Sequence, residues 1–163
     1  MFGCGGGGQT ASQGHAGAGA QNAHAQVGQP APPFTLKDVD GKTVSLAQFH
    51  GKPVFVNAFA TWCPPCKQEL PGIVAAYPAN KDKVVFIGVD EQEDVELVTP
   101  FLRRFGITYQ VLLDPGDVAD HYDIASLPES FFIDRNGKLV KTYRGFMTPD
   151  VLKANLAALE GGS

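Results

Sequence analysis

Cysteine is scarce in this chain: the 163 residues include three, Cys4, Cys63 and Cys66. That number is too small for a fold held together by many disulfides, and too small for a zinc site made of four cysteines. The formal net charge of −4 gives no electrostatic basis for binding nucleic acid. No apolar run approaches the roughly 18 residues of a membrane-spanning helix, and no charged stretch leads into an apolar one as in a complete signal peptide.

Charged side chains are missing from the beginning of the chain, because residues 1–28 contain no Asp, Glu, Lys or Arg. Gly, Ala, Gln, Ser and His dominate there, and such a segment buries too little apolar surface to fold by itself. We therefore predict a flexible tether over residues 1–28 and one folded domain over residues 29–163. The chain as a whole is 44% hydrophobic and 18% charged, within the range of globular proteins with a sizeable core.

Strands and helices are expected to alternate through the folded domain. Apolar, β-branched runs predict buried strands, and the Asp40-Gly41 pair predicts a hairpin turn. A helix near Pro100 should start or kink at that residue, with Thr99 as its cap. This order of elements predicts a central sheet with helices on both faces. The expected strands cover residues 31–46 (as a hairpin), 52–60, 83–90, 109–113, 130–134 and 138–145, and the expected helices cover residues 63–76, 93–106, 116–124 and 148–160.

The stretch "FATWCPPCKQELP", residues 59–71, carries the chemistry of the domain. Cys63 and Cys66 are separated by two residues, and in the first turn of a helix this spacing brings their Cα atoms within the range of a disulfide, about 4.4–6.8 Å. A bond that closes so small a ring removes little chain entropy from the unfolded state. The pair is therefore better suited to reaction than to stabilising the fold.

The position of Cys63 predicts which sulfur attacks. The strand before it delivers Cys63 to the beginning of a helix, where unpaired backbone N–H groups and the helix dipole favour an anion. A thiolate is stabilised there, and the thiolate is the attacking species. We expect Cys63, the more exposed of the two, to attack a substrate disulfide and Cys66 to resolve the mixed disulfide. This interpretation depends on an accessible, partly ionised Cys63.

Two prolines between the cysteines limit this stabilisation. Pro64 and Pro65 would occupy the first two helical positions, and neither has an N–H group, so only the N–H of Cys66 can reach the Cys63 sulfur. We expect a weak depression of the Cys63 pKa and a dithiol that is a good reductant. The competing zinc interpretation needs about four ligands, and would require His50 or His121 to converge on the pair.

The segments "APPFTLKDVDGKTVSL", "GKPVFVNAFATWCPPCKQELP", "FIGVD" and "LPESFFIDRNGKLVKTYRG" together resemble the thioredoxin superfamily. More narrowly, they are similar to the TlpA-like, membrane-anchored thioredoxins of bacteria, which include the cytochrome c-biogenesis reductases. The resemblance covers about residues 29–160. It implies an α/β fold of thioredoxin type: three α/β/α layers, a mixed central sheet and an N-terminal β-hairpin extension. It implies a redox-active disulfide, with no other cofactor and no metal.

The same resemblance assigns roles around the cysteines. Cys63 is the nucleophile, Cys66 is the resolving thiol and Trp62 is a platform beside them. Pro128 matches a proline that follows a cis peptide bond and faces the active site, so that Leu127 presents backbone groups to a bound peptide. With Pro64 and Pro65, these residues are expected to border the substrate.

Three polar positions extend the site. Asn57 stands where ordinary thioredoxins carry a buried aspartate, so this chain lacks that base. Glu69 matches a glutamate that tunes or deprotonates the cysteines in some TlpA-like reductases, and the alternative is a solvated helix carboxylate. Glu129 occurs in some cytochrome-maturation members, where it would assist proton transfer or bias substrate choice. Pro71 matches the helix-kinking proline of the family.

Cys4 lies in "MFGCGGGG", which resembles the end of a lipobox, although the upstream apolar helix is absent. Acylation of Cys4 would tether the domain in the bacterial periplasm or at the outer face of the cytoplasmic membrane, and the alternative is an incidental exposed thiol. We expect a monomer that contacts the membrane only through this N-terminal anchor. A membrane electron donor of the thiol–disulfide type would reduce it.

The leading functional hypothesis is an extracytoplasmic thiol–disulfide oxidoreductase that reduces protein disulfides, such as the haem-site cysteines of apocytochrome c or a copper-site protein. One alternative is a peroxiredoxin-like thiol peroxidase, which the hairpin region also resembles, but Ala60 stands where such enzymes carry a threonine. The other is a copper-binding metallochaperone on a thioredoxin fold. Such proteins space their cysteines by three residues and add a histidine, for which His121 is the candidate besides His50.

Overall fold

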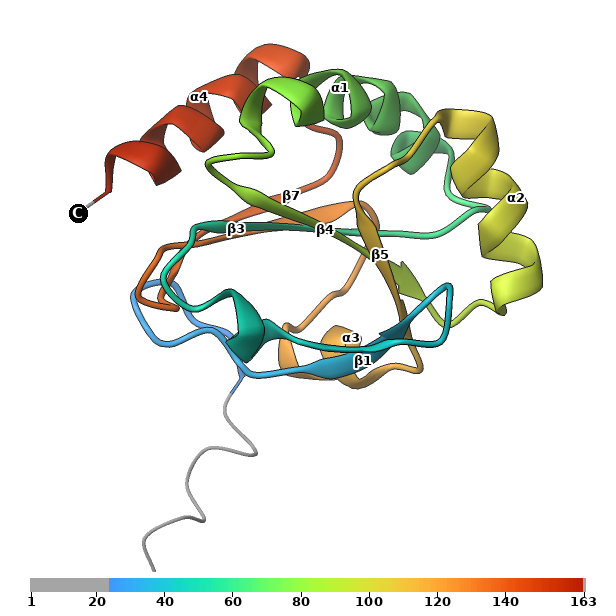
Figure 1. Cartoon of the computed structure of the whole chain (residues 1–163), viewed down its shortest axis with the longest axis horizontal. Coiled ribbons are helices and arrows are strands. Elements are labelled where there is room, and N and C mark those ends of the chain that lie inside the picture. Colours follow the sequence, from blue (N-terminus) through green and yellow to red (C-terminus); the bar gives the residue numbers. More distant parts are fainter. Residues whose placement is uncertain (1–23, 163) are drawn as a thin grey trace, which may run out of the picture.

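The computed structural model describes residues 24–162, which form a mixed sheet of seven strands between two layers of helices (Figure 1). In chain order the elements are β1 (Thr35–Asp38), β2 (Thr43–Ser45), the short 3₁₀ helix η1 (Leu46–Phe49), β3 (Val54–Phe59), α1 (Pro64–Asn80), β4 (Val85–Glu91), α2 (Val95–Phe105), β5 (Gln110–Asp114), α3 (Asp117–His121), β6 (Glu129–Ile133), β7 (Leu139–Arg144) and α4 (Pro149–Gly161).

The strands lie in the order β2-β1-β5-β4-β3-β6-β7. Strands β3, β4 and β5 run parallel, whereas β1, β2, β6 and β7 pair antiparallel with their neighbours. All the residues of β3 are buried, as expected of a central strand covered on both faces. The three-layer class, the mixed sheet and the N-terminal hairpin predicted from the sequence are confirmed.

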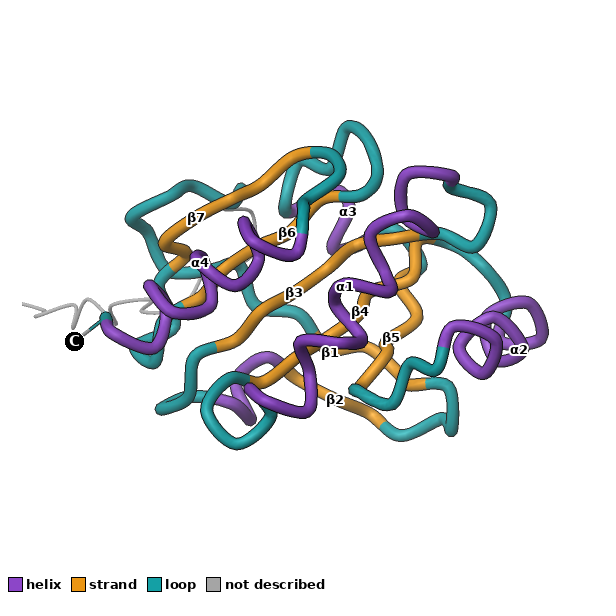
Figure 2. The backbone as a smooth tube through the Cα atoms, turned by 90° about the horizontal axis from the view of Figure 1, so that it is seen from above, coloured by secondary structure: helices purple, strands orange, loops and turns teal. Residues whose placement is uncertain are grey.

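Side chains alternate between the two faces of the sheet and so build two cores. Helices α1, α2 and α4 cover one face, where Phe55, Phe59 and Phe86 are buried. The short helices α3 and η1 cover the other face, over residues such as Val56 and Ile87. Seen from above, α1 crosses the middle of the sheet, α4 lies over the side of β6 and β7, and α2 lies beyond β5 (Figure 2).

Helix α2 covers nearly all of its predicted range, residues 93–106, but it does not start at Pro100. It begins at Val95, after Asp94, and runs through Pro100 to Phe105, so a helix start at Pro100 with Thr99 as its cap is wrong. The buried faces of Val98, Phe101 and Leu102 anchor a continuous helix, because residues spaced by three and four positions share one side. Helix α1 also runs further than expected, to Asn80. None of the helices within residues 24–162 has the length and apolar character needed to cross a bilayer.

The chain before β1 packs against the domain. The N–H of Ala25 donates to the carbonyl of His121 at 2.8 Å, and the N–H of Gly28 donates to the carbonyl of Leu139 at 2.7 Å. The predicted boundary at residue 28 therefore falls within a packed segment. The rest of the predicted tether, including Cys4, lies outside the described residues.

Candidate active site

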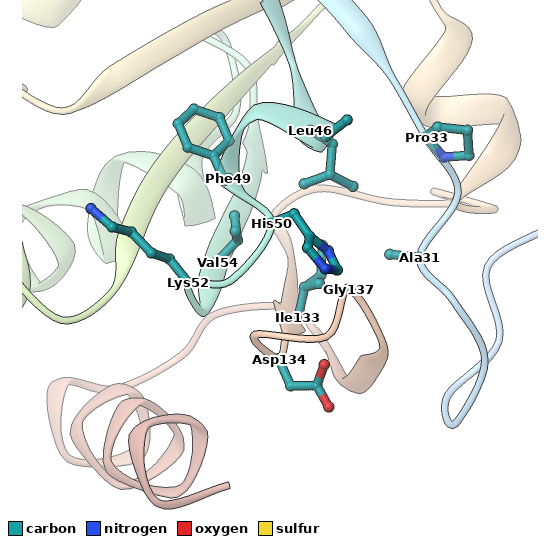
Figure 3. Close-up of a pocket in the computed structure, with 11 residues that line it drawn as sticks. Ala31, Pro33, Leu46, Phe49, His50, Lys52, Val54, Ile133, Asp134 and Gly137 are labelled. Atoms are coloured by element: carbon teal, nitrogen blue, oxygen red, sulfur yellow. The ribbon is translucent and has the colours of Figure 1, made fainter. Parts of the chain in front are cut away.

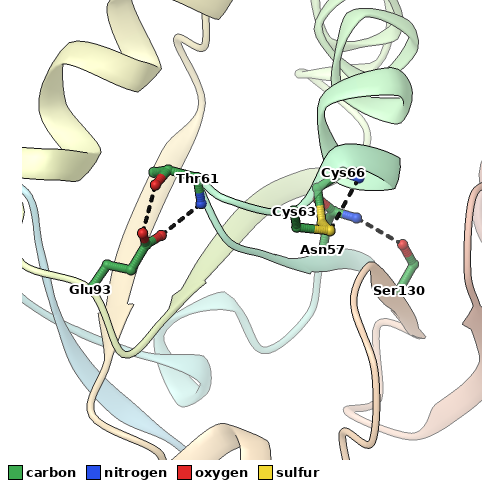
Figure 4. The surroundings of a disulfide bond; sticks show 6 residues. All are labelled: Asn57, Thr61, Cys63, Cys66, Glu93 and Ser130. Atoms are coloured by element: carbon green, nitrogen blue, oxygen red, sulfur yellow. Dashed lines mark hydrogen bonds between the residues drawn. A yellow bond between two sulfur atoms is a disulfide. The ribbon is translucent and has the colours of Figure 1, made fainter.

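The cysteine pair lies where β3 ends and α1 begins (Figure 4). Cys63 is the N-cap of α1, with Pro64 and Pro65 at the first two helical positions. A disulfide joins Cys63 to Cys66, whose Cα atoms are 5.3 Å apart. The Cys66 N–H donates to the Cys63 sulfur at 3.3 Å. The helix start, the position of both prolines and the donor to the sulfur are as predicted.

Both sulfurs are covered in the disulfide form. Cys63 is 3% exposed and Cys66 is 1% exposed, so the prediction of an accessible Cys63 is wrong for this state. The reason is that the first turn of α1 turns both side chains toward the sheet, into the core cluster that contains Phe59 and Leu70. Trp62 beside them is 66% exposed. The residue next to the buried disulfide in the chain therefore offers an exposed aromatic ring to a partner.

The loop before β6 borders the disulfide. The Leu127–Pro128 peptide bond is cis, as the resemblance implied. Leu127 packs against the core cluster that holds both cysteines. Glu129, at the start of β6, pairs with Ala58 near the end of β3, so this loop lies at the same end of the sheet as the disulfide. The Gly145 N–H donates to the Pro128 carbonyl at 2.8 Å, which holds the end of β7 against this loop. The next residue in the chain, Phe146, is 43% exposed. Sequence reasoning did not single out Phe146.

Glu69 is buried beneath α1. It is 3% exposed, and neither carboxyl oxygen has a hydrogen-bond partner. Burial raises the pKa of Glu69 to about 8, although the nearby Asn57 side chain and Met147 backbone lower it in part. The interpretation of Glu69 as a solvated carboxylate is therefore wrong. Asn57 itself donates to the Ser130 hydroxyl at 3.1 Å (Figure 4).

Glu129 points to the other face of the sheet. Its neighbour Ser130 bonds to Asn57, on the side of α1, whereas Glu129 lines a pocket with Tyr122 and Asp123 that follow α3. Glu129 is fully buried, and one oxygen accepts a hydrogen bond from Arg144 Nε at 3.0 Å. Burial raises the pKa of Glu129, and Arg144 opposes the shift. The two predicted glutamates are therefore not brought together.

A contact that sequence reasoning missed holds the loop before Cys63 (Figure 4). The Thr61 N–H and the Thr61 hydroxyl both donate to the Glu93 carboxylate, each at 2.6 Å. Asp90, at the end of β4, is fully buried beside Glu93. The acidic run "VDEQED" after an apolar strand is the signal in the sequence, but its partner lies 32 residues earlier.

His50 and His121 do not approach Cys63 and Cys66. His121 ends α3, on the other face of the sheet, with Nδ1 2.8 Å from the Asp117 carbonyl. His50 precedes β3 and lines a cavity of about 180 Å³ with Ile133 and Gly137, at the end of β3 away from the disulfide (Figure 3). In the described part of the chain, no group of three His, Cys, Asp or Glu side chains could hold a metal ion.

The Cys63–Cys66 disulfide lies at a helix start, at the same end of the sheet as a cis-proline loop. Such a disulfide can exchange with the thiols of another protein. This combination of fold and site defines a thioredoxin-like redox protein. Comparison with known proteins agrees. Residues 27–142 match the AhpC/TSA family, and the chain belongs to that family.

Its relatives specify the activity. The chain is 38% identical over 136 residues to the thiol-disulfide oxidoreductase ResA of Geobacillus thermodenitrificans. The matched stretch covers 82% of this chain and 78% of that protein. It is similar in structure to a thiol:disulfide interchange protein of the thioredoxin family from Chlorobium tepidum, with a TM-score of 0.76, 30% identity and coverage of 85% and 100% of the two chains. The exposed lipoprotein thioredoxin Etrx1 of Streptococcus pneumoniae has a TM-score of 0.67 and 34% identity, over 78% and 99% of the two chains. This chain is a thiol–disulfide oxidoreductase with the Cys63–Cys66 pair.

Proposed function

We propose that this protein works outside the cytoplasm as a reductant of protein disulfides. The observation that carries the proposal is the single N–H, that of Cys66, at the Cys63 sulfur, because Pro64 and Pro65 remove the other donors of the first turn. A thiolate with fewer donors is less stabilised, and a less stabilised dithiol gives up its electrons more readily.

The reduced pair would act in two steps. The Cys63 thiolate attacks one sulfur of the substrate disulfide, that bond breaks, and a mixed disulfide and a substrate thiolate form. The Cys66 thiolate then attacks the Cys63 sulfur, so that the second substrate thiolate leaves and the Cys63–Cys66 disulfide forms. Two electrons pass to the substrate, and the protons lost by the two cysteines end on its thiols.

Glu69 is suited to assist the second step. It follows Cys66 by three residues in α1, and its buried carboxyl has no hydrogen-bond partner. With a pKa of about 8, the carboxyl is close to the working pH, where a general base is most effective. In its ionised form it can take the proton of the Cys66 thiol and make that sulfur nucleophilic.

Substrate would bind across Trp62, Pro64 and Pro65, with the backbone of Leu127 beside Pro128. Trp62 and the two prolines are exposed, which suits contact with a peptide. Glu129 would bias substrate choice through its pocket rather than transfer protons, because it lies on the face of α3. The substrates we propose are the haem-site cysteines of apocytochrome c or the cysteines of a copper-site protein, in keeping with the similarity to ResA.

A membrane protein with its own dithiol would reduce the Cys63–Cys66 disulfide after each turnover. The similarity to an exposed lipoprotein thioredoxin supports an extracytoplasmic location, in the periplasm or at the outer face of the cytoplasmic membrane. Acylation of Cys4 would anchor a monomer there, on a leash of up to roughly 3.3 Å per residue.

Three measurements test the proposal. Reduction of insulin disulfides should be abolished in Cys63→Ser, and Cys66→Ala should trap a mixed disulfide with the physiological substrate. Equilibration with glutathione should give a potential nearer the roughly −270 mV of a reductant than the roughly −120 mV of a strong oxidant. A potential at the oxidising end would overturn the direction of electron flow and leave the disulfide chemistry intact.

The two alternative functions have less support from the site. Ala60, which precedes Cys63 by three residues, is a buried apolar residue and offers no hydroxyl for a peroxide. For a copper chaperone, His121 and the cysteines lie on opposite faces of the sheet.

A further inference from the structure

Two acidic residues, Asp90 and Glu93, lie together where β4 leads into α2, beside the loop that carries Trp62 and Cys63. Asp90 is the last buried residue of β4. It lies on the face of α1 and α2, since it follows Gly88 by two residues and a Cβ at Gly88 would meet the Phe59 ring. Glu93 follows in the turn, half-buried. Its carboxylate accepts the Thr61 N–H and the Thr61 hydroxyl, each at 2.6 Å (Figure 4).

The backbone of the turn is built to aim Glu93 at Thr61. Gln92 adopts a φ of 58°, a left-handed conformation that costs energy in a residue other than glycine. The Gln92 N–H donates to the Asp114 carbonyl at 2.9 Å, which fixes the turn to β5. Such backbone strain persists only where the surrounding structure requires one geometry. At Gln92 we infer that the required geometry is the one that places Glu93 next to Thr61.

Asp90 lies beside Glu93 in the core, and neither of its carboxyl oxygens has a hydrogen-bond partner. Burial, and then the adjacent Glu93, raise the pKa of Asp90 to about 8, so Asp90 adds no negative charge next to Glu93 at pH 7. Burial alone would raise the pKa of Glu93, but the bonds from Thr61 and the contact with Asp90 outweigh it and lower that pKa. The charged Glu93 carboxylate thus accepts both Thr61 donors, one on each oxygen, and such bonds belong to the strong class of hydrogen bond.

We propose that Glu93 is a positioning residue for disulfide exchange: it clamps Thr61 and so fixes the loop that sets Cys63 at the start of α1. The loop is short, because β3 ends at Phe59 and the Cys63 N–H already donates to the Ala60 carbonyl at 3.3 Å. Thr61 has two donors in this loop, and both are held by Glu93. Neither Glu93 nor Thr61 bonds to a sulfur, so the clamp acts through the position of Cys63. This inference rests on the Cys63–Cys66 pair being the reacting group.

The test measures the rate at which the reduced protein reacts with oxidised glutathione at pH 7. Thr61→Val removes one donor without changing charge, and Thr61→Ser restores it. We expect Thr61→Val to slow the reaction about tenfold, within the roughly hundredfold cost of a 1 Å misplacement, and Thr61→Ser to stay within about twofold of the wild type. Cys63 remains the attacking sulfur in each variant. The rate at which Cys63 is alkylated is therefore a second measure of its reactivity, independent of the reaction with glutathione.

Glu93→Ala separates position from charge. Loss of a nearby negative charge would by itself lower the Cys63 pKa and increase the fraction of thiolate, which would speed the reaction at pH 7. The clamp predicts the opposite, a reaction at least as slow as in Thr61→Val. Glu96→Ala is the matched control, because it removes the same charge from the exposed first turn of α2, and it should keep the wild-type rate.

The double variant Thr61→Val/Glu93→Ala should be no slower than Glu93→Ala, because both changes remove one contact. Rates equal to the wild type in Thr61→Val and Glu93→Ala, or effects that multiply in the double variant, would overturn the proposal. If Glu93→Ala does not fold, the Thr61→Val and Thr61→Ser pair still decides, with thermal melting as the check of folding. Should the wild type itself fail to react with glutathione, the redox assignment fails instead.

Discussion

Glu69 shows how burial changes the chemistry of a single side chain. On an exposed helix face this carboxylate would be ionised at neutral pH, whereas in the core its pKa rises to about 8 because burial penalises the charged form. The pKa of Glu91 is also raised to about 8, mainly because of burial and to a smaller extent because Asp114 lies nearby. Of these acids, Glu69 is the one placed in α1 beneath the cysteines.

Glu69→Gln should slow the resolution of the mixed disulfide, because the amide cannot accept the proton of Cys66. General-base catalysis is worth roughly a hundredfold or more, so we expect a loss of at least that size in the second step and little change in the first. Stopped-flow measurement of each step with a peptide disulfide checks this. Glu96→Gln, at an exposed helical glutamate, is the control, and an equal loss in both variants would contradict the role.

Asp90 makes stability depend on pH. Its pKa is raised to about 8 in the folded protein, so the folded state holds a proton that the unfolded state releases above about pH 4. The stability from this group is full below that pH and is lost as the pH rises through 8. The melting temperature of Asp90→Asn should therefore fall less between pH 5 and pH 8 than that of the wild type. Asp82→Asn, at an exposed site, should follow the wild type, and parallel curves for Asp90→Asn would refute the assignment.

The first turn of helix α1 follows the loop from β3 and contains the redox pair, with Cys63 as the N-cap and Cys66 at the third helical position. The N-cap side chain accepts from the second or third helical N–H. Pro65 stands at the second position and Cys66 at the third, and the bond comes from Cys66. The sequence of this turn therefore sets how strongly a Cys63 thiolate is stabilised.

Pro65→Ala should make the protein more oxidising. The new N–H adds a donor to the Cys63 thiolate, and a gain of about 1.4 kcal/mol for the reduced form corresponds to roughly 30 mV. Glutathione equilibration measures the shift, which should be positive, together with a lower Cys63 pKa. Pro78→Ala changes an exposed proline later in the same helix and should leave the potential unchanged. A potential for Pro65→Ala equal to that of the wild type would remove the argument from missing donors.

The elements themselves could be predicted where their signals are local. The apolar run of β3 and the Asp40-Gly41 turn gave the right strands, and Thr148 caps α4 through the Val151 N–H at 3.3 Å. The bounds of α2 were predicted to within two residues, but Pro100 does not start it, because the packing of Val98 and Phe101 overrides the local preference of Pro100. The packing of residues 24–28 was also missed, since their composition gives no periodic signal.

Hydrogen bonds join this N-terminal segment to the rest of the domain. Tyr122 donates to the Pro32 carbonyl at 2.7 Å, next to the bonds of Ala25 and Gly28. We expect deletion of residues 1–23 to leave the melting temperature unchanged. Deletion of residues 1–32 removes several hydrogen bonds worth about 1 kcal/mol each and should lower the melting temperature by roughly 10 °C. Calorimetry of both truncations checks this, and equal melting temperatures would show that the segment adds nothing to stability.

The sequence by itself determined the reacting pair, its two prolines and the helix that begins there, because these depend on neighbours within one turn. It also determined the fold class, through apolar runs and the motifs that carry the family resemblance. Only the tertiary structure decided that Cys63 is covered, that Glu69 and Glu129 lie on opposite faces, and that Glu93 holds Thr61. These features depend on segments far apart in the chain that meet when the sheet forms, and burial, which sets the charge of each acid, exists only after they meet.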